Sequence, residues 1–184
     1  YANERVQFDR QISKYGAIRF KIAEMATKIY AVESANYRAG QNIDDAYDEL
    51  VAGGMDQGKA KLKSTEQFAV EYAILKVWGS EVLDYVTDEG VQIYGGMGFS
   101  ADAPMDRSYR DARINRIFEG TNEINRLLTV DMMLKRAMKG ELDLMTPATA
   151  VAAELMSIPD FGEEDTTLFA AEKKIIQNLK KATL

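Results

Sequence analysis

The residues that decide the fold lie between Val91 and Arg126. They read VQIYGGMGF at residues 91–99, PMDRSYRDARI at residues 104–114 and IFEGTNEINR at residues 117–126. The first segment has three glycines among four consecutive residues. The second has closely spaced arginines, and the third has one glutamate between an aromatic residue and a glycine. Because glycine and proline punctuate helices, we expect helical segments joined by sharp turns.

The arginine segment predicts a helix that starts at Pro104, where proline suits a first turn, and ends near Ile117. A further helix is expected from Gly120–Thr121 to Gly140. No alternating β pattern of any length is present in the sequence. The predicted fold class is therefore all-α, with a four-helix core arranged as an antiparallel up-and-down bundle.

Helical periodicity also marks the residues that follow Gly16. Apolar side chains recur there at spacings of four and three, which is typical of a helix that packs on a partner helix. Gly40 is a plausible C-cap for this helix. The apolar positions are Ile18, Ile22, Met25, Ile29 and Val32.

Two more helices are expected before the glycine-rich segment. The first is short and acidic, at residues 44–50, and Gly53–Gly54 and Gly58 would break it. The second is the longest, from Leu62 to about Glu89, and Gly79 would lie within it where another helix passes closely.

The chain changes character after Gly140. Pro147, Pro159 and the stretch 162–165 punctuate two further helices, expected at 148–156 and 168–179. We predict a helical bundle at residues 1–140 and the start of a helical C-terminal extension at residues 141–184. Residues 1–14 read as the end of a helix and a turn, and we expect the chain to be a fragment of a longer protein.

The composition excludes several classes of function. The net charge of −6 argues against general nucleic-acid binding, which needs a basic surface. The chain has no cysteine and no histidine, so thiolate nucleophiles, serine–histidine triads and most metal sites are excluded, and we predict no metal. No apolar run approaches the length of a membrane span. Acid–base chemistry would fall to carboxylates, lysine or tyrosine.

The glycines and arginines can be interpreted in ordinary structural terms. The spacing of Gly95, Gly96 and Gly98 after a helix is wrong for a dinucleotide-binding fingerprint and favours a helix-to-helix turn. The arginines recur every three residues and form a basic row on one helix face. That row could be a solvated face or could bind phosphate or carboxylate groups. Its members are Arg107, Arg110, Arg113 and Arg116.

Glu119 is the candidate catalytic residue. A carboxylate near a helix start is often only favourable with the helix dipole. However, Phe118 and Gly120 indicate a close-packed position, where desolvation would raise the pKa of Glu119 and the helix terminus would lower it. These opposing effects could leave a usable base, and backbone N–H groups at the same helix start could hold an anionic oxygen.

Together, the three segments resemble the C-terminal helical domain of the acyl-CoA dehydrogenases. The resemblance follows the same motifs in the same order. It extends to ERVQF at residues 4–8, Ala17–Ile18 and AEMA at residues 23–26, and covers about residues 1–140. The tail after Gly140 is similar to longer, very-long-chain-like members. The family fold has an α-helical, a β and a second α-helical domain that together hold FAD, so this chain would lack the first two.

The resemblance implies that Glu119 abstracts the α-proton of an acyl-CoA while the β-hydride passes to flavin N5, as in fatty acid β-oxidation. Phe118, Glu119 and Gly120 would contact substrate, and Thr121 and Glu123 would contact the flavin. The remaining cofactor positions fall in two groups. Arg5, Gln7 and Phe8 match positions that touch the FAD of a neighbouring subunit, and Gln92, Gly95 and Gly96 match positions near its adenosine and phosphates.

One departure affects the first of these groups. The family usually continues after Phe8 with Gly-Lys-Pro, whereas this chain has Asp9-Arg10-Gln11. This changes a turn and one charge near the cofactor.

The implied partners are an acyl-CoA substrate, an electron-transfer flavoprotein as acceptor, and further copies in a homodimer or homotetramer. No nucleic acid and no integral membrane segment are expected. The implied location is the bacterial cytoplasm, or the mitochondrial matrix in a eukaryote. Two alternatives remain open: an acyl-CoA oxidase or related flavin oxidase, and a helical module that serves only oligomerisation. We expect residues 1–184 alone to be inactive.

Overall fold

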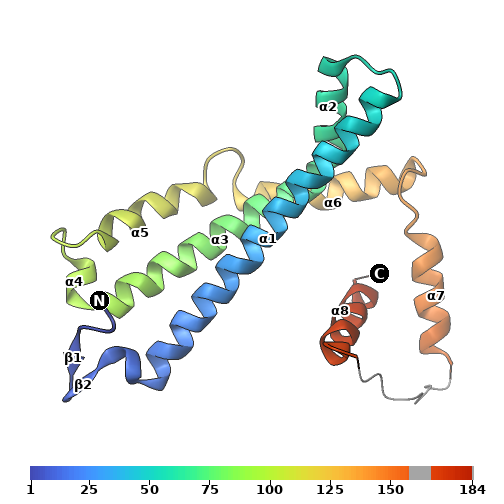
Figure 1. The fold of residues 1–184 in the computed structure, drawn as a ribbon. Coiled ribbons are helices and arrows are strands. Elements are labelled where there is room, and N and C mark those ends of the chain that lie inside the picture. Colours follow the sequence, from blue (N-terminus) through green and yellow to red (C-terminus); the bar gives the residue numbers. More distant parts are fainter. Residues whose placement is uncertain (158–166, 184) are drawn as a thin grey trace. The chain divides into compact units, whose positions relative to one another are not determined.

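The computed structural model describes residues 1–157 and 167–183 (Figure 1). The chain divides into two compact units, Tyr1–Asp131 and Met132–Leu184. Within the described residues, no helix is long and apolar enough to cross a membrane. Pro159 and the stretch 162–165, which the sequence marks as helix breakers, lie outside the described residues.

Two long antiparallel helices form the centre of the first unit (Figure 1). Helix α1 spans Gly16–Ala52 and helix α3 spans Ala69–Tyr94, and they pack along each other. The ion pair between Lys21 and Glu89 joins them, as does the Tyr85 hydroxyl, which donates to Glu24 Oε2 at 3.1 Å. Helix α5, at Met105–Arg113, packs on α3, and α2, at Gln57–Gln67, packs on α1.

The helices approach closely because the buried side chains are small. A Cβ atom added at Gly79 would lie 3.6 Å from Val32 Cγ1, so the expected close passage of a second helix at Gly79 is confirmed. Alanine and valine dominate the buried apolar positions. These positions are Ala39, Ala46, Ala60, Val70, Ala73, Val77, Val82, Ala103 and Ala112.

Helix α1 is longer than the sequence predicts. It continues through Gly40 and through residues 44–50, so the cap at Gly40 and the separate acidic helix are both wrong. An internal glycine costs roughly 1 kcal/mol, and the packing of α1 on α2 and α3 outweighs that cost. The helix ends before Gly53, as expected, but Gly58 lies inside α2 and does not break it.

The helix expected from Leu62 to about Glu89 is two helices. Helix α2 ends at Gln67, α3 begins at Ala69, and Phe68 between them has φ −103° and ψ 18°. No glycine or proline marks this break, so the helical periodicity on both sides hides it. The N-terminus of α2 does carry a recognisable signal, because the Asp56 side chain accepts a hydrogen bond from the Lys59 N–H at 3.2 Å.

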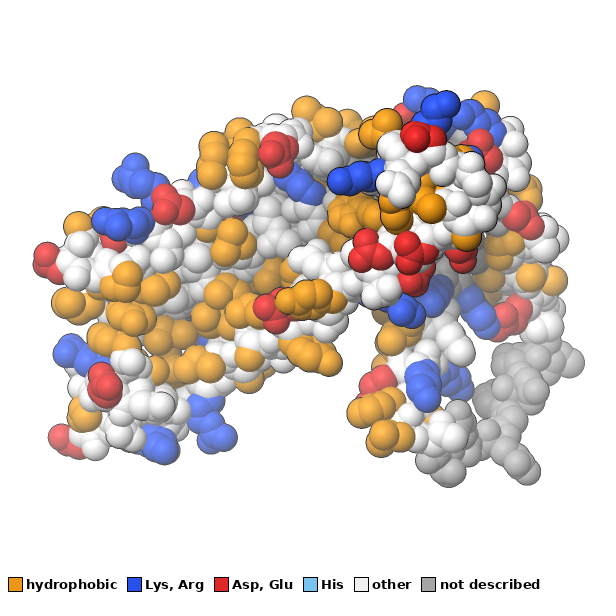
Figure 2. Space-filling view, turned by 45° about the horizontal axis from the view of Figure 1, so that its top comes forward, with side chains coloured by type: hydrophobic (Ala, Val, Ile, Leu, Met, Phe, Trp, Pro, Cys, Tyr) orange, Lys and Arg blue, Asp and Glu red, His pale blue; other side chains and the backbone are white. Residues whose placement is uncertain are grey.

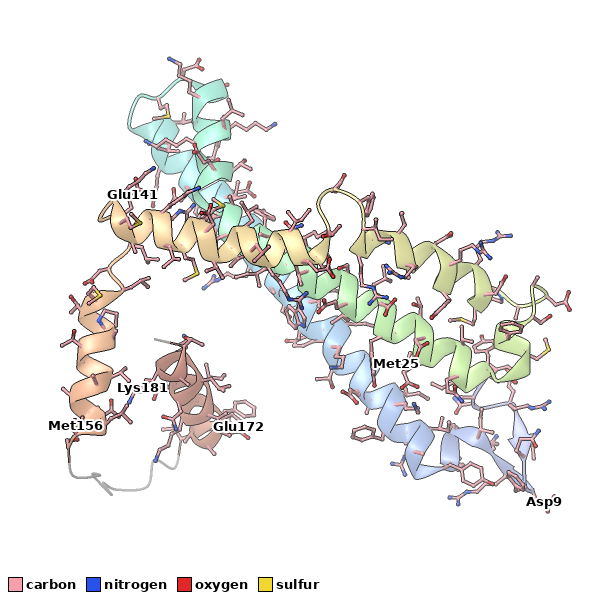
Figure 3. The ribbon with its side chains drawn as sticks, turned by 180° about the vertical axis from the view of Figure 1, so that it is seen from behind. Asp9, Met25, Glu141, Met156, Glu172 and Lys181 are labelled. Atoms are coloured by element: carbon pink, nitrogen blue, oxygen red, sulfur yellow. The ribbon has the colours of Figure 1, made fainter. Side chains whose placement is uncertain are left out.

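The first residues form a small β-hairpin, which corrects the helix end predicted there. Strands β1, Val6–Gln7, and β2, Arg10–Gln11, pair in antiparallel register. Phe8 and Asp9 form the two-residue turn with φ of 52° and 59°, and Asp9 lies at the tip (Figure 3). Two left-handed residues are typical of a type I′ turn. Strands of two residues are too short for an alternating pattern, and a 3-10 helix, Ile12–Lys14, follows them.

The glycine-rich segment forms the expected turn between helices. Gly95 ends α3 with φ 62° and ψ −141°, and the short helix α4, Gly96–Phe99, follows directly. Pro104 immediately precedes α5, and a 3-10 helix, Ile114–Arg116, extends α5 to the region where the sequence predicts its end.

Helix α6 spans Asn122–Met138, so the boundary between the two units lies inside it. Gly140, with φ 74°, follows its end as expected. In the second unit, α7 spans Met145–Leu155 and α8 spans Ala170–Ala182, and both agree with the predicted helices. Lys181 of α8 pairs with Glu154 of α7 at 2.5 Å (Figure 3). The described residues therefore confirm the all-α class.

Candidate functional site

The turn that carries Glu119 has an uncommon backbone conformation. Glu119 has φ 54° and Gly120 has φ 83°, so two consecutive residues are left-handed. For a glutamate this costs roughly 1–2 kcal/mol. A residue with a side chain would be strained at this φ of Gly120, and its Cβ atom would lie only 3.0 Å from Asn125 Nδ2. Both effects explain why glycine is needed there. Strained conformations of this kind persist only where surrounding contacts hold them.

A polar cluster holds this turn against α3. Lys76 Nζ donates to the Gly120 carbonyl at 2.7 Å and to Asn122 Oδ1 at 2.8 Å. Asn125 Nδ2 also donates to the Gly120 carbonyl, at 2.9 Å. Asn122, which is only 2 % exposed, donates to Ser80 Oγ at 3.0 Å. The turn is thus fixed by side chains from both α3 and α6.

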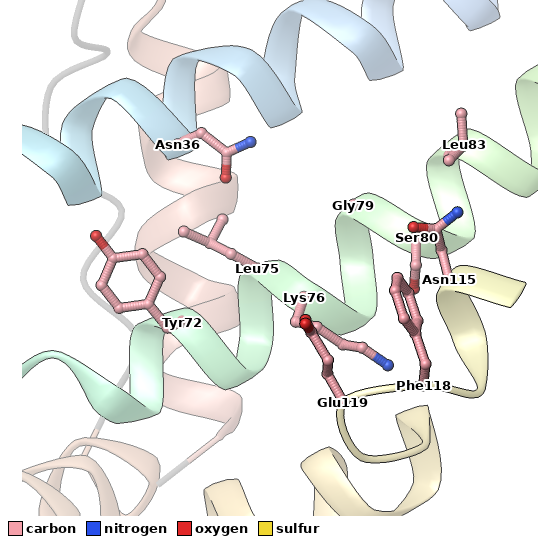
Figure 4. A pocket seen from close by; sticks show the side chains of 10 residues that line it. All are labelled: Asn36, Tyr72, Leu75, Lys76, Gly79, Ser80, Leu83, Asn115, Phe118 and Glu119. Atoms are coloured by element: carbon pink, nitrogen blue, oxygen red, sulfur yellow. The ribbon is translucent and has the colours of Figure 1, made fainter. Parts of the chain in front are cut away.

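Glu119 and Phe118 lie at a cavity of about 360 Å³ on the α1–α3 side of the turn (Figure 4). Lys76 and Ser80 contribute polar groups to its lining, and Asn36 contributes an amide from α1. Both Phe118 and Glu119 are exposed, so the described residues do not provide the close packing that the sequence suggests around Glu119. The remaining lining residues are Tyr72, Leu75, Gly79, Leu83 and Asn115.

Thr121 and Glu123 lie beside this turn, at the start of α6. The Thr121 hydroxyl accepts a hydrogen bond from the Ile124 N–H at 3.3 Å and so caps the helix. Hydrogen bonds from its own backbone N–H and from the Thr121 hydroxyl hold the pKa of the Glu123 carboxyl below its ordinary value. Both residues line a small cavity of about 130 Å³ that Arg113 also faces.

The arginines of the basic row differ in their surroundings: one forms an ion pair with a neighbouring helix, and two line cavities. Arg116 Nη2 pairs with Asp84 Oδ1 at 2.9 Å, so its guanidinium helps to join the end of α5 to α3. Arg113 borders the small cavity beside Thr121, and together with Arg110 it also lines a wider cavity of about 660 Å³ next to Phe99. The structural interpretation therefore holds for Arg116.

The other predicted cofactor residues gather at the far end of α3. Tyr1 stacks on Tyr94 with ring centroids 4.2 Å apart, which ties the N-terminal segment to the glycine turn. The Tyr15 hydroxyl donates to the Gln7 carbonyl at 2.9 Å and holds the hairpin on the start of α1. The residues of this group are Arg5, Gln7, Phe8, Gln92, Gly95 and Gly96.

These residues present open polar and aromatic groups. Phe8 is 90 % exposed at the hairpin tip, and Arg5 and Gln92 are exposed. Nothing lies within 4 Å of a Cβ atom built at Gly95 or Gly96, so another group can approach the backbone there. A planar cofactor with phosphates would fit such a surface, because guanidinium groups suit phosphate and a bare backbone allows close contact.

The predicted site residues therefore form two groups along α3. One is the turn at Phe118, Glu119, Gly120, Thr121 and Glu123, which lies near Ser80, and the other is the hairpin and glycine turn near Gln92. At a rise of about 1.5 Å per residue, Ser80 and Gln92 are about 18 Å apart along α3. A single small ligand cannot touch both groups in one chain. Among the described residues, no acidic cluster of three or more could hold a metal ion.

The roles of Lys76, Asn122 and Asn125 at the turn are not apparent from local sequence patterns. Lys76 lies between the buried Ala73 and Val77 in a mostly apolar helix. The one sequence feature that could have indicated its role is this charged residue on a face that packs against other helices. The contacts of Lys76 are with residues 44 and 46 positions away, which no local pattern reveals.

The chain is similar to known proteins over most of its length. Residues 1–134 match the family described as acyl-CoA dehydrogenase, C-terminal domain. A probable acyl-CoA dehydrogenase of Bacillus subtilis is 44% identical over 185 residues, a match that covers 100% of this chain and 31% of that protein. The human very long-chain specific mitochondrial acyl-CoA dehydrogenase is 42% identical over 127 residues, or 69% of this chain and 17% of that protein.

A solved structure is similar over nearly the whole chain. The crystal structure of an acyl-CoA dehydrogenase complexed with FAD from Bacillus anthracis superposes with a TM-score of 0.88 and 46% identity. The match covers 98% of this chain and 30% of that one. This chain thus spans about a third of the length of the Bacillus proteins that it resembles.

Proposed function

Because this chain belongs to the family of acyl-CoA dehydrogenase C-terminal domains, we propose that it is the C-terminal helical part of an FAD-dependent acyl-CoA dehydrogenase. The enzyme would remove hydrogens from Cα and Cβ of an acyl-CoA thioester, as in fatty acid β-oxidation. The observation that carries this proposal is the strained turn at Glu119 and Gly120, which holds one carboxylate at the edge of a cavity.

In this proposal Glu119 is the base. Its carboxylate takes the α-proton of the thioester and holds it, while the bound FAD supplies the acceptor for the β-hydride. The carboxylate projects from a turn whose backbone is held by side chains of α3 and α6, so the backbone that carries it is positioned before substrate arrives. Phe118 and Gly120 would contact the substrate beside it.

The Glu119 backbone N–H would donate to the thioester carbonyl. Polarising this carbonyl would stabilise the negative charge that develops when the α-proton leaves. Because Gly120 has no side chain, the substrate could approach the backbone closely where it enters the site.

The two groups of cofactor residues would serve different FAD molecules. Thr121 and Glu123 would contact the flavin beside Glu119. The hairpin residues Arg5, Gln7 and Phe8, and the glycine-turn residues Gln92, Gly95 and Gly96, would contact the FAD of a neighbouring subunit. The separation of about 18 Å along α3 means that the two groups do not meet at one flavin ring. The assignment of the second group to the FAD of a neighbouring subunit rests on the family resemblance.

The proposed partners are an acyl-CoA, an electron-transfer flavoprotein as acceptor and further copies of the enzyme in a dimer or tetramer. The proposed location is the bacterial cytoplasm. Residues 1–184 alone would hold FAD poorly, because most of the flavin surface would come from domains outside this chain. Comparing oxygen with an electron-transfer flavoprotein as acceptor separates a dehydrogenase from an oxidase.

The test is Glu119→Gln in the FAD-loaded enzyme that contains this chain. We expect flavin reduction by acyl-CoA to slow by at least about 10²–10⁴-fold, since the amide cannot accept the proton. FAD content should not change. The matched control is Glu33→Gln, which neutralises an exposed carboxylate on α1 and should reduce at the normal rate. Normal reduction by Glu119→Gln would rule out Glu119 as the base.

A further inference from the structure

We propose that Lys76 is a positioning residue for Glu119. Its ammonium group would fix the left-handed turn at Glu119–Gly120 and thereby the direction of the Glu119 carboxylate. This inference rests on the proposed function, because the position of the carboxylate affects the reaction only if Glu119 is the base. Lys76 lies in the N-terminal third of α3, on a different element from the residue that it positions.

The first observation is the geometry of the Lys76 contacts. Its Nζ atom donates to the Gly120 carbonyl at 2.7 Å and to Asn122 Oδ1 at 2.8 Å. Hydrogen bonds from a charged donor are stronger than bonds between neutral groups. These two bonds reach the residue directly after Glu119 and the first residue of α6. They therefore connect both sides of the turn to one atom of α3.

The second observation is the strain in the turn. Glu119 and Gly120 are both left-handed, and a glutamate has little intrinsic preference for this conformation. The Gly120 carbonyl accepts bonds from Lys76 and from Asn125 Nδ2, so its direction is determined by two donors. If one donor is lost, the strained turn is held less firmly and can leave its left-handed conformation, and this change in the Glu119 and Gly120 dihedral angles redirects the Glu119 carboxylate.

The third observation is the environment of Lys76. The side chain is half-buried and lines the same cavity as Glu119 (Figure 4). Its two bonded acceptors are a backbone carbonyl and an amide oxygen, and neither carries a full charge. Burying part of an ammonium group against neutral acceptors is costly. A role in holding the turn accounts for a lysine at a position between buried apolar residues.

The test uses Lys76→Met in the FAD-loaded enzyme that contains this chain. Methionine keeps much of the side-chain length but has no donor. We expect the rate of flavin reduction by acyl-CoA, per bound flavin, to fall about 10–100-fold, because a small misplacement of a catalytic group has effects of this size. The KM for acyl-CoA and the FAD content should stay close to those of the parent enzyme.

Two further variants separate positioning from general stability. Lys76→Arg keeps a cationic donor, and the 360 Å³ cavity leaves room for it, so it should recover most of the lost rate. Lys21→Met removes another partly buried lysine of the first unit, one that pairs with Glu89 away from the turn, and should reduce flavin normally. A normal rate per flavin in Lys76→Met, with FAD content or Tm lowered, would show a merely structural role and overturn the proposal.

The double variant distinguishes this proposal from the assignment of Glu119. In Glu119→Gln the residual rate should not fall further when Lys76→Met is added, because Lys76 acts through Glu119. If Glu119→Gln is inactive and Lys76→Met reduces flavin normally, only the positioning role fails. If Glu119→Gln reduces flavin normally, the base assignment itself fails, and the role of Lys76 fails with it.

Discussion

Glu119 and Gly120 set the geometry of the turn that enters α6, and they do so at some cost in local free energy. Left-handed backbone is favourable only for glycine, yet the first of the two residues is a glutamate. The turn is maintained by Lys76, Asn122 and Asn125 rather than by its own preference. At the scale of single residues, the site depends on hydrogen bonds that reach across elements.

Gly120→Ala is expected to lower the free energy of unfolding by about 1–2 kcal/mol, because alanine is strained at φ 83°. Its Cβ atom would also press on Asn125 Nδ2 at 3.0 Å. Urea unfolding monitored by helical circular dichroism measures the change.

The matched control for this prediction is Gly40→Ala. It makes the same substitution inside α1, where nothing lies within 4 Å of the new Cβ atom and φ is helical. This variant should be more stable by roughly 0.5–1 kcal/mol. An unchanged or raised stability of Gly120→Ala would contradict the strain assigned to this turn.

At the scale of secondary-structure elements, the ion pair between Arg126 and Glu81 joins helix α6 to helix α3. Arg126 Nη1 lies 2.9 Å from Glu81 Oε1, and Arg126 Nη2 donates to Glu81 Oε2 at 2.9 Å. The hydrogen bond from Arg126 is the largest cause that holds the pKa of the Glu81 carboxyl below its ordinary value. Because the pair is partly exposed, its contribution to stability is small.

This pair should contribute a stability that depends on pH. A carboxyl whose pKa is lower in the folded state stabilises the fold above its unfolded value of 4.5 and loses that effect as the pH falls through the folded value. Arg126→Ala should therefore lower Tm by about 1–2 °C at pH 7 and by progressively less below pH 4.5.

Thermal unfolding of both proteins between pH 3 and pH 7 checks this expectation. Arg107→Ala serves as the control, since it removes an exposed arginine of α5 and should give a difference that does not vary with pH. A Tm difference for Arg126→Ala that stays constant down to pH 3 would show that the pair contributes nothing through Glu81.

Large apolar side chains remain uncovered in both units, which is the main feature at the scale of the whole molecule. On the left of Figure 2, hydrophobic groups lie on the surface of the first unit in many places. Phe20 is 68 % exposed and Tyr37 is 79 % exposed along α1. The buried apolar positions hold mostly alanine and valine, so much of the larger apolar area is available for contact with other protein.

We predict that residues 1–184 associate in solution in a concentration-dependent way, through the α1 face that includes Phe20. Phe20→Glu should raise the dissociation constant by about 10-fold or more, since burial of a phenylalanine contributes about 1.5–3 kcal/mol. Phe20→Leu, which stays apolar, should change it much less. Light scattering across a concentration series measures the assembly, and a monomer at every concentration would contradict it.

The sequence by itself determined the helical class, the turn at Gly95–Gly96, the end of α6 before Gly140 and the identity of the candidate base. These features depend on local chemistry: spacing of apolar residues, the conformational freedom of glycine, and a motif of consecutive residues around Glu119. The three ordered segments also led to the correct family, because their combination is far more specific than any one of them.

Only the tertiary structure decided the features that depend on distant contacts. Packing on α2 and α3 carries α1 through Gly40, and α3 begins after Phe68 without a local signal. The hairpin at Phe8–Asp9 is too short to leave a pattern. Lys76 meets the Glu119–Gly120 turn across 44 residues of sequence, because the antiparallel packing of the helices returns the chain to the N-terminal third of α3.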